Sequence, residues 1–290
     1  MARIAIIGGG SIGEALLSGL LRAGRQVKDL VVVERVPERA DYLADTYSVR
    51  IGTVPDAVEN ASFVVVAVKP ADVESVMAEI ARAAGAAESD TAEQVFVTVA
   101  AGITIGYFES KLPAGTPVVR AMPNAAALVG AGVTALAKGR FVTAPQLEGV
   151  SALFDSVGGV LSVPEGQMDA VTALSGSGPA YFFLLVEALV DAGVGAGLSR
   201  EVATDLTAQT MAGSAAMLLE RMDNDREPGE AEAPGRVDAT ATQLRATVTS
   251  PGGTTAAALR ELERGGLRAA VDAAVQAAKR RSEQLRITSE

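Results

Sequence analysis

The stretch from Ile4 to Leu20, "IAIIGGGSIGEALLSGL", places a short apolar run directly before a cluster of glycines and a helix-like repeat of apolar residues. Gly8, Gly10 and Gly13 have the spacing G-x-G-x-x-G between a predicted strand and a predicted helix. In that context Gly8 permits a tight turn, Gly10 lets a pyrophosphate approach the backbone, and Gly13 lets the helix pack against the strand. A plain strand-to-helix turn can use one glycine but has no need for this set. The stretch therefore predicts a dinucleotide site, in which the amides of the helix start hold the phosphates.

The rest of the first half repeats this alternation of strand and helix. Its apolar runs are continuous rather than alternating, as a sheet covered on both faces requires. The runs are Arg3–Gly8, Leu30–Glu34, Phe63–Val68, Gln94–Ala100 and Pro117–Met122. We therefore expect an α/β fold that begins with a Rossmann-like domain, a doubly wound parallel sheet over residues 1–164.

After about Pro164 the β-branched runs end, and stretches of Ala, Leu and Met predict long helices. The predicted helices are Gln167–Ala173, Gly178–Ala192, Arg200–Arg221, Thr254–Glu263 and Leu267–Leu285. Met222–Ala241 carries charge, Pro and Gly without an apolar period, so we expect an exposed loop there. The second domain, residues 165–290, is expected to be all helical.

The composition limits the chemistry. The 290 residues include no His and no Cys, so a thiol nucleophile, an imidazole base and the usual kind of zinc site are excluded, and no metal is expected. A net charge of -10 argues against a nucleic-acid partner. The N-terminus lacks the pattern of a signal peptide, and Ala180–Val186 is too short an apolar run to span a membrane, so it is expected to be a core helix. A cysteine-free chain fits the reducing cytoplasm.

The strand after the glycine loop ends in Glu34, about twenty residues on, where an acidic side chain can bind the adenosine 2′-OH of NAD. Arg35 and Arg39 favour the opposite preference, because either can pair with the 2′-phosphate of NADP. Each arginine is equally well explained as a solvated charge on a helix face. The sequence leaves the choice between NADH and NADPH open.

Two further strand ends carry polar residues at the edge of the sheet where ligands bind. Val68 is followed by Lys69 and Pro70, a cation and a rigid turn that either contact the cofactor or form a surface turn before a helix. Asn124 follows the strand in "RAMPN" and either lines the nicotinamide or substrate pocket or hydrogen-bonds its own turn.

A second glycine cluster, "ALSGSGPAY", interrupts an otherwise apolar helical stretch at residues 175–179. Gly and Pro inside a helix cost about 1–3 kcal/mol each, so something must approach closely there. Two helices packed across small residues explain the cluster without a ligand, and the two explanations are compatible.

The third cluster lies in "TVTSPGGTTAAALREL", Thr247–Leu262. Ser250 begins a turn, Gly252 and Gly253 leave the backbone bare, and Thr254 or Thr255 begins a helix that lacks the Glu or Gln of a capping box. The amides at this helix start are left to hold an anion of carboxylate size, together with a threonine hydroxyl. A plain N-cap explains one threonine and one glycine but not the doubled set.

Taken together, "IIGGGSIGEAL", "AVKP", "RAMPN", "ALSGSGPAY" and above all "VTSPGGTTAAALREL" resemble the pyrroline-5-carboxylate reductase family over nearly the whole chain. The resemblance implies reduction of 1-pyrroline-5-carboxylate to L-proline with NADPH or NADH, the last step of proline biosynthesis. It also implies a helical domain that forms an intertwined homodimer, often within a ring of dimers such as a decamer.

The resemblance also assigns roles to residues. The substrate carboxylate would be held by Ser250, Gly252, Gly253, Thr254 and Thr255, with the candidate catalytic Thr255 closest to the ring nitrogen. The cofactor would be faced by Gly8, Gly10, Ser11, Ile12, Gly13, Val68, Lys69 and Pro70, with Glu34, Arg35 and Asn124 as further candidates. A cyclic imine that arrives protonated is already electrophilic, so placing the hydride donor is the main task and strong acids or bases are dispensable.

Two rival functions make different demands on the sequence. A related hydroxy-acid dehydrogenase would use a catalytic lysine in the helical domain, but the only lysine after residue 164 is Lys279, far from the glycine clusters in sequence. A non-catalytic NAD(P)-binding redox sensor would keep the first glycine cluster and have no need for the other two.

Overall fold

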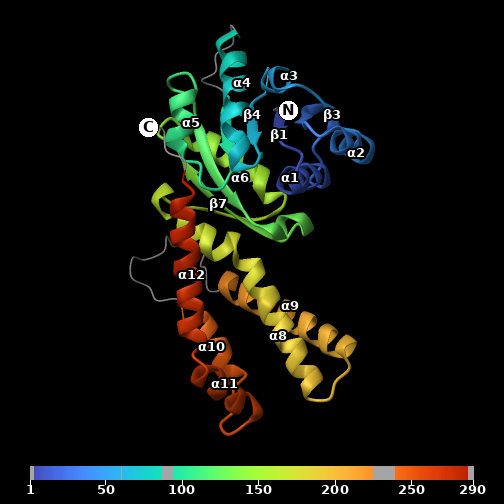
Figure 1. Cartoon of the computed structure of the whole chain (residues 1–290), viewed down its shortest axis with the longest axis vertical. Helices are drawn as coiled ribbons and strands as arrows, with labels where there is room; N and C mark the ends of the chain where they lie inside the picture. The colour runs from blue at the N-terminus through green and yellow to red at the C-terminus, as the bar shows by residue number, and fades with distance from the viewer. Residues whose placement is uncertain (1–2, 60, 87–93, 225–238, 287–290) are drawn as a thin grey trace. The chain divides into compact units, whose positions relative to one another are not determined.

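The computed structural model describes residues 3–59, 61–86, 94–224 and 239–286. Its first half forms an eight-stranded sheet in the order β3-β2-β1-β4-β5-β6-β7-β8 (Figure 1). All neighbouring strands are parallel except β6 and β7. The strands are β1 (Ile4–Ile7), β2 (Leu30–Val33), β3 (Arg50–Ile51), β4 (Phe63–Val66), β5 (Val95–Thr98), β6 (Val118–Pro123), β7 (Gly132–Lys138) and β8 (Gly158–Ser162).

Helices cover both faces of the sheet, as the continuous apolar strands predict. Successive residues of a strand point to opposite faces, so Ile4 and Ile6 pack in one core and Ala5 and Ile7 in the other. The first core includes α1, α2 and α6, and the second includes α3, α4 and α5. These helices are α1 (Ser11–Arg22), α2 (Pro37–Tyr47), α3 (Val54–Val58), α4 (Val73–Ala86), α5 (Ile105–Lys111) and α6 (Ala144–Asp155). The α/β doubly wound fold is confirmed.

The order of the strands reverses direction at β1, because β2 lies on one side of β1 and β4 on the other. In sheets of this type ligands bind at such a switch point, outside the carboxyl ends of the strands. The glycine loop after β1 and the residues after β2 and β4 meet there. The fold thus positions three of the predicted cofactor segments at one edge.

The second half is helical. Its helices are α7 (Met168–Val171), α8 (Gly178–Gly195), α9 (Arg200–Asn224), α10 (Thr240–Thr247), α11 (Thr254–Arg264) and α12 (Leu267–Gln284). The helix α10 begins inside the predicted loop Met222–Ala241, and α9 continues into it as far as Asn224. The remainder of that loop, residues 225–238, lies outside the described residues.

By contacts the chain divides into two compact units. Unit 1 comprises residues 1–179 and 275–290, and unit 2 comprises residues 180–274. The chain therefore leaves unit 1 within α8 and returns to it within α12. The predicted boundary between residues 164 and 165 stays a prediction.

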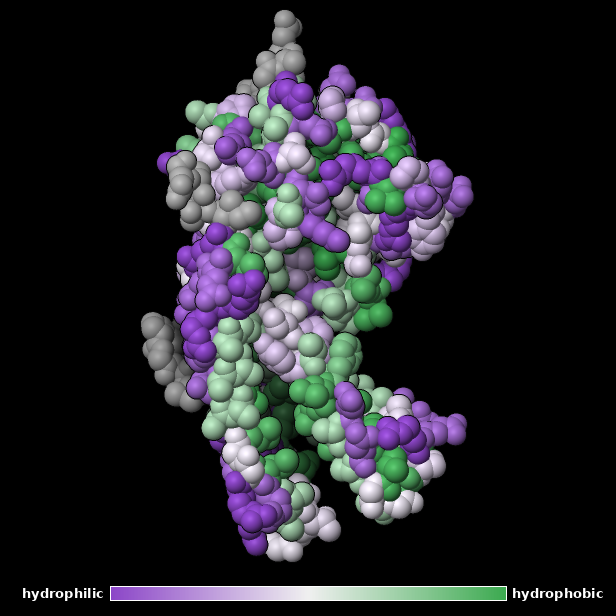
Figure 2. All heavy atoms as spheres, in the orientation of Figure 1, coloured by the Kyte–Doolittle hydropathy of each residue, from purple (hydrophilic) through white to green (hydrophobic). Residues whose placement is uncertain are grey.

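Apolar side chains are exposed on the helices of unit 2 (Figure 2). In α8 alone, Phe182, Phe183, Leu184 and Leu185 are about half to two-thirds exposed. The prediction that this run forms a core helix therefore fails for the single chain. By length and composition the helical stretch Glu165–Gly195 is also apolar enough to cross a membrane, with 17% of its most apolar window buried.

Candidate functional site

The glycine loop after β1 has the geometry that its spacing predicts. Gly8 adopts a φ of +107°, and a Cβ there would lie 2.6 Å from the carbonyl oxygen of Ala67, at the end of β4. A Cβ on Gly13 would lie 2.0 Å from the carbonyl oxygen of Gly8. Both glycines are therefore required by contacts within the protein itself.

Gly10 is different, because a Cβ added to it would meet no atom within 4 Å. Gly10 is the N-cap residue of α1, and no side chain caps that helix start. The amides of Ser11, Ile12 and Gly13 thus belong to the first turn of a helix without a side-chain cap, the setting in which phosphates bind. The bare backbone at Gly10 fits a diphosphate, since no contact among the described residues requires a glycine there.

A cavity of about 800 Å³ opens beside this helix start and extends along the ends of β1, β2 and β4. Seven of the predicted cofactor residues line it: Gly8, Gly10, Ser11, Glu34, Arg35, Val68 and Lys69. The predicted residues Ile12, Gly13, Pro70 and Asn124 are outside its lining. The structure therefore gathers most of the predicted set around one space large enough for a nucleotide.

Beside this cavity, at the end of β2, Glu34 is directed toward the backbone. Its Oε2 accepts a hydrogen bond from the amide of Gly9 at 2.9 Å, and its Oε1 accepts from the amides of Arg35 and Val36 at 2.8 and 3.0 Å. Arg35 is exposed and forms an ion pair with Asp72, with 2.6 Å between Nη2 and Oδ1.

Arg39 bonds the same glycine from its other side and also pairs with the first turn of α1. Its Nε donates to the carbonyl oxygen of Gly9 at 2.8 Å, and its Nη2 pairs with Glu14. The hydroxyls of Tyr42 and Tyr47 also donate to Glu14. Burial alone would raise the pKa of Glu14, but the hydrogen bonds from Arg39 and the two tyrosines outweigh it and hold that pKa below its usual value.

The remaining predicted cofactor residues have local roles as well. Lys69 is exposed at the cavity and precedes Pro70, which begins a short 3-10 turn before α4. The Oδ1 of Asn124 accepts from the amide of Val133 at 3.2 Å, so this side chain joins the end of β6 to the start of β7. The sequence suggests that Asn124 either lines the nicotinamide or substrate pocket or bonds its own turn. The observed hydrogen bond reaches β7, the next strand.

The third glycine cluster lies in unit 2, at the start of α11. Gly252 has a φ of +72°, and Gly253 is the N-cap residue of α11, which no side chain caps. A Cβ on Gly253 would lie 2.6 Å from the Oγ of Ser250, so this glycine is required by the turn itself. The uncapped helix start is confirmed, and Thr255 is half-buried in its first turn, next to the exposed Thr254.

The second cluster, "SGSGPAY", does not break the helix but widens it. Thr172–Gly176 forms a π-helical turn, with the amide of Ser177 bonded to the carbonyl of Thr172 at 2.9 Å. A Cβ on Gly176 would lie 2.8 Å from the methyl carbon of Met122, the residue in β6 just before Pro123. The predicted close approach is thus a methionine side chain, and π-turns of this kind are frequent at functional sites.

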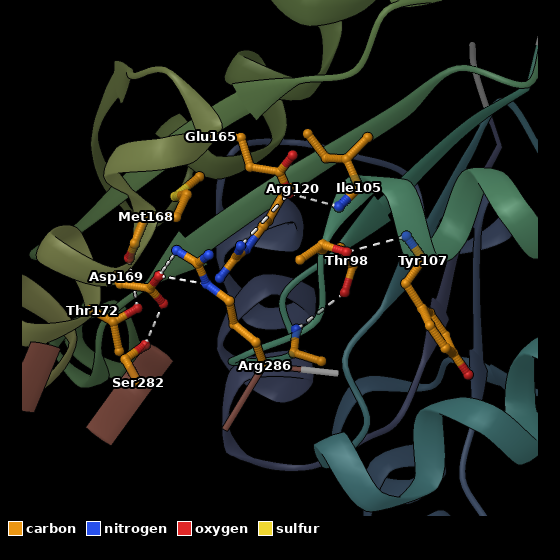
Figure 3. Close-up of polar contacts among 12 residues, drawn as sticks. Thr98, Ile105, Tyr107, Arg120, Glu165, Met168, Asp169, Thr172, Ser282 and Arg286 are labelled. Atoms are coloured by element: carbon orange, nitrogen blue, oxygen red, sulfur yellow. Dashed lines mark hydrogen bonds and ion pairs between the residues drawn. The ribbon is translucent and has the colours of Figure 1, made fainter. Parts of the chain in front are cut away.

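A buried polar cluster in unit 1 escaped the sequence analysis (Figure 3). Asp169, fully buried, accepts a hydrogen bond of 2.7 Å from the Oγ of Ser282 and pairs with Arg286. Arg120 is also buried, with 3.6 Å between its Nη1 and the Oε1 of Glu165. The Nη2 of Arg120 has no hydrogen-bond partner among the described residues. Ser282 and Arg286 are more than a hundred residues from Asp169 in the sequence, so no local sequence pattern predicts these contacts.

Burial and hydrogen bonding act in opposite directions on the pKa values of this cluster. Burial alone would raise the pKa of Asp169, but the hydrogen bonds from Ser282 and Arg286 outweigh it and lower that pKa from its usual value of 3.8. Burial lowers the pKa of Arg120, against the opposing effect of Glu165. The cluster ties α12 and the start of the helical region to β6.

Comparison with known proteins places this geometry in a family. The chain is 82% identical to a pyrroline-5-carboxylate reductase from Mycobacterium tuberculosis (strain ATCC 25618 / H37Rv), over 100% of this chain and 99% of that protein. The chain belongs to the pyrroline-5-carboxylate reductase family.

The other comparisons agree with membership in this reductase family. A model of pyrroline-5-carboxylate reductase dimerisation matches residues 165–285, and a model of NADP oxidoreductase, coenzyme F420-dependent, matches residues 3–102. A solved pyrroline-5-carboxylate reductase from Coxiella burnetii is 34% identical over 99% of both chains, with a TM-score of 0.86. A Plasmodium falciparum pyrroline carboxylate reductase solved with NADP bound is 28% identical over 98% of both chains, with a TM-score of 0.78.

Proposed function

We propose that this protein reduces 1-pyrroline-5-carboxylate to L-proline with NADPH or NADH, the final step of proline biosynthesis. The observation that carries the proposal is the pair of uncapped, glycine-rich helix starts, at Gly10 and at Gly253, in a chain 82% identical to a reductase of that name. One helix start suits a diphosphate and the other a carboxylate. These are the anionic groups of the proposed cofactor and substrate.

In this proposal the amides of Ser11, Ile12 and Gly13 hold the diphosphate in unit 1, and residues 68–70 and Asn124 contact the rest of the cofactor. The bound nicotinamide supplies the hydride. In unit 2, Ser250, Gly252, Gly253 and Thr254 hold the substrate carboxylate on backbone N–H groups and hydroxyls. Thr255 places its hydroxyl at the ring nitrogen, where it manages the proton of the imine.

The exposed apolar helices support a homo-oligomer. Phe183 and Leu184 are each about two-thirds exposed, and they lie in the region matched by the dimerisation model. We propose that a second copy of the chain covers this face, that dimers associate further into a ring such as a decamer, and that the enzyme works in the cytoplasm. A dimer interface explains the apolar surface of α8 without a membrane.

The deciding experiment is NAD(P)H oxidation by the purified protein, followed at 1-pyrroline-5-carboxylate concentrations that bracket saturation. Turnover with either cofactor and formation of L-proline are expected. Nucleotide binding without turnover would favour a redox sensor, and turnover of a hydroxy acid instead of the imine would favour a related dehydrogenase. Against the latter, Lys279 is on α12 and pairs with Glu283, with 3.5 Å between Nζ and Oε1.

A further inference from the structure

The middle residue of the glycine loop is held from two sides. The amide of Gly9 donates to Glu34 at 2.9 Å, and its carbonyl oxygen accepts from the Nε of Arg39 at 2.8 Å. Gly9 itself is buried, and a Cβ there would lie 2.3 Å from Leu43 and 3.1 Å from Glu34. Both groups on Gly9 are therefore fixed by side chains that follow β2.

Each of these side chains is itself fixed. The Oε1 of Glu34 accepts hydrogen bonds from the amides of Arg35 and Val36, so the carboxylate bridges the glycine loop and the turn after β2. The guanidinium of Arg39 is paired with Glu14, in the first turn of α1. Charge-assisted hydrogen bonds of this kind are about twice as strong as neutral ones, so the bridge is a stiff one.

We propose that Glu34 and Arg39 are positioning residues that clamp Gly9 and so preset the amides of the next residues for the cofactor's diphosphate. The inference rests on the proposed function and goes beyond it, because it assigns Glu34 to the glycine loop instead of the ribose. Because the carboxylate is bonded to three backbone amides, the clamp predicts that Glu34 affects the binding of NADH and NADPH alike. Choice between the two cofactors then belongs to other groups at the cavity.

The test is a double-mutant-type cycle: the protein loses the Glu34 carboxylate and the ligand loses its 2′-hydroxyl. ADP and 2′-deoxy-ADP are titrated calorimetrically into wild type and Glu34→Gln. Glutamine has a single acceptor oxygen, which cannot serve both the amide of Gly9 and the amides of Arg35 and Val36. The clamp therefore predicts that both ligands bind more weakly by the same factor, about 5- to 30-fold. If Glu34 binds the 2′-OH instead, wild type prefers ADP and the variant loses that preference, which overturns the clamp. Unchanged or tighter ADP binding overturns it too.

A matched control separates the clamp from general electrostatics. Glu38→Gln removes the same charge from the first turn of α2, outside the lining of the cavity, and ADP affinity is expected to stay within about twofold. A loss in Glu38→Gln as large as in Glu34→Gln would contradict the clamp.

Arg39→Gln tests the other side of Gly9. It is expected to weaken ADP and 2′-deoxy-ADP equally and to raise KM for both cofactors while kcat is retained. Amide hydrogen exchange of wild type gives a readout that needs no variant, because the Gly9 amide must be protected before nucleotide is added. Rapid exchange at Gly9 overturns the clamp. Normal ADP binding with no turnover of the imine would instead refute the proposed function alone.

Discussion

At the scale of the residue, Thr255 carries the proposed proton chemistry and is open to a direct test. Thr255→Ala is expected to lower kcat/KM for the imine by about 10- to 100-fold, through KM or kcat, because a hydroxyl at the substrate nitrogen is lost. Thermal unfolding should change little, since the structure gives α11 no side-chain cap. Thr247→Ala is the control, because the hydroxyl of Thr247 bonds, within the described part of the chain, the backbone carbonyl of Leu244. Wild-type kinetics in Thr255→Ala would show that the hydroxyl is dispensable.

Asp169 provides the second prediction at this scale. Asp169→Asn is expected to lower the free energy of unfolding by about 2 kcal/mol near neutral pH, because Arg286 and Arg120 lose a buried counter-charge. Urea unfolding measures the difference. Asp191→Asn is the control: its pair with Arg200 is exposed on both sides and should matter by less than about 1 kcal/mol.

The difference in stability between wild type and Asp169→Asn is also expected to depend on pH. Because the pKa of Asp169 is lowered on folding, its stabilising contribution is present above its usual value of 3.8 and is lost as pH falls through that value toward the folded pKa. Below about pH 4 the free energy of unfolding of the wild type should therefore fall more steeply than that of Asp169→Asn. The difference in stability between the two proteins should narrow as the pH is lowered. A constant gap down to that range would show that the carboxylate is not ionised in the folded protein.

At the scale of the element, the entrance to α1 separates a glycine needed for folding from one needed for the ligand. Gly13→Ala brings a Cβ to 2.0 Å from a backbone oxygen, so the loop must shift and both stability and nucleotide binding should fall. The Cβ of Gly10→Ala would meet no atom within 4 Å, so the thermal stability should hold. The affinity for ADP should fall about tenfold or more, because the Cβ would lie where the diphosphate binds. Thermal unfolding and calorimetric titration of both variants check this contrast. Normal ADP affinity in Gly10→Ala would place the diphosphate elsewhere.

The elements also show how far the sequence reaches. Five apolar strands and the helices that follow the first and third glycine clusters were predictable, because periodicity and glycine spacing are local signals. The strands β7 and β8 were missed, since "GVTALAK" and "GGVLS" are rich in Gly and Ala and gain their strand conformation from pairing with β6 and each other. The helix α10, "TATQLRAT", lacks an apolar stripe and was likewise missed. Contacts between distant segments, such as Glu34 with Gly9, depend on tertiary structure alone.

At the scale of the whole molecule, the exposed face of α8 predicts how the protein assembles. Leu184→Glu is expected to weaken self-association by about 2–4 kcal/mol, because a charge would be buried among apolar side chains. Sedimentation velocity over a range of concentrations measures the shift toward smaller species. Glu187→Gln, on the same helix, should leave assembly intact. An unchanged oligomer in Leu184→Glu would place the interface on another face.

The bond between Asp169 and residues 282–286 also has a consequence for biosynthesis. The ribosome makes Asp169 more than a hundred residues before Ser282 and Arg286, and unit 2 is translated in between. Throughout that interval the carboxylate lacks its two hydrogen-bonding partners, Ser282 and Arg286, so the nascent Rossmann unit must stay incompletely packed or keep the site hydrated. Premature termination within α12 would leave every proposed ligand-binding residue in place and still produce a polypeptide prone to recognition by chaperones and proteases.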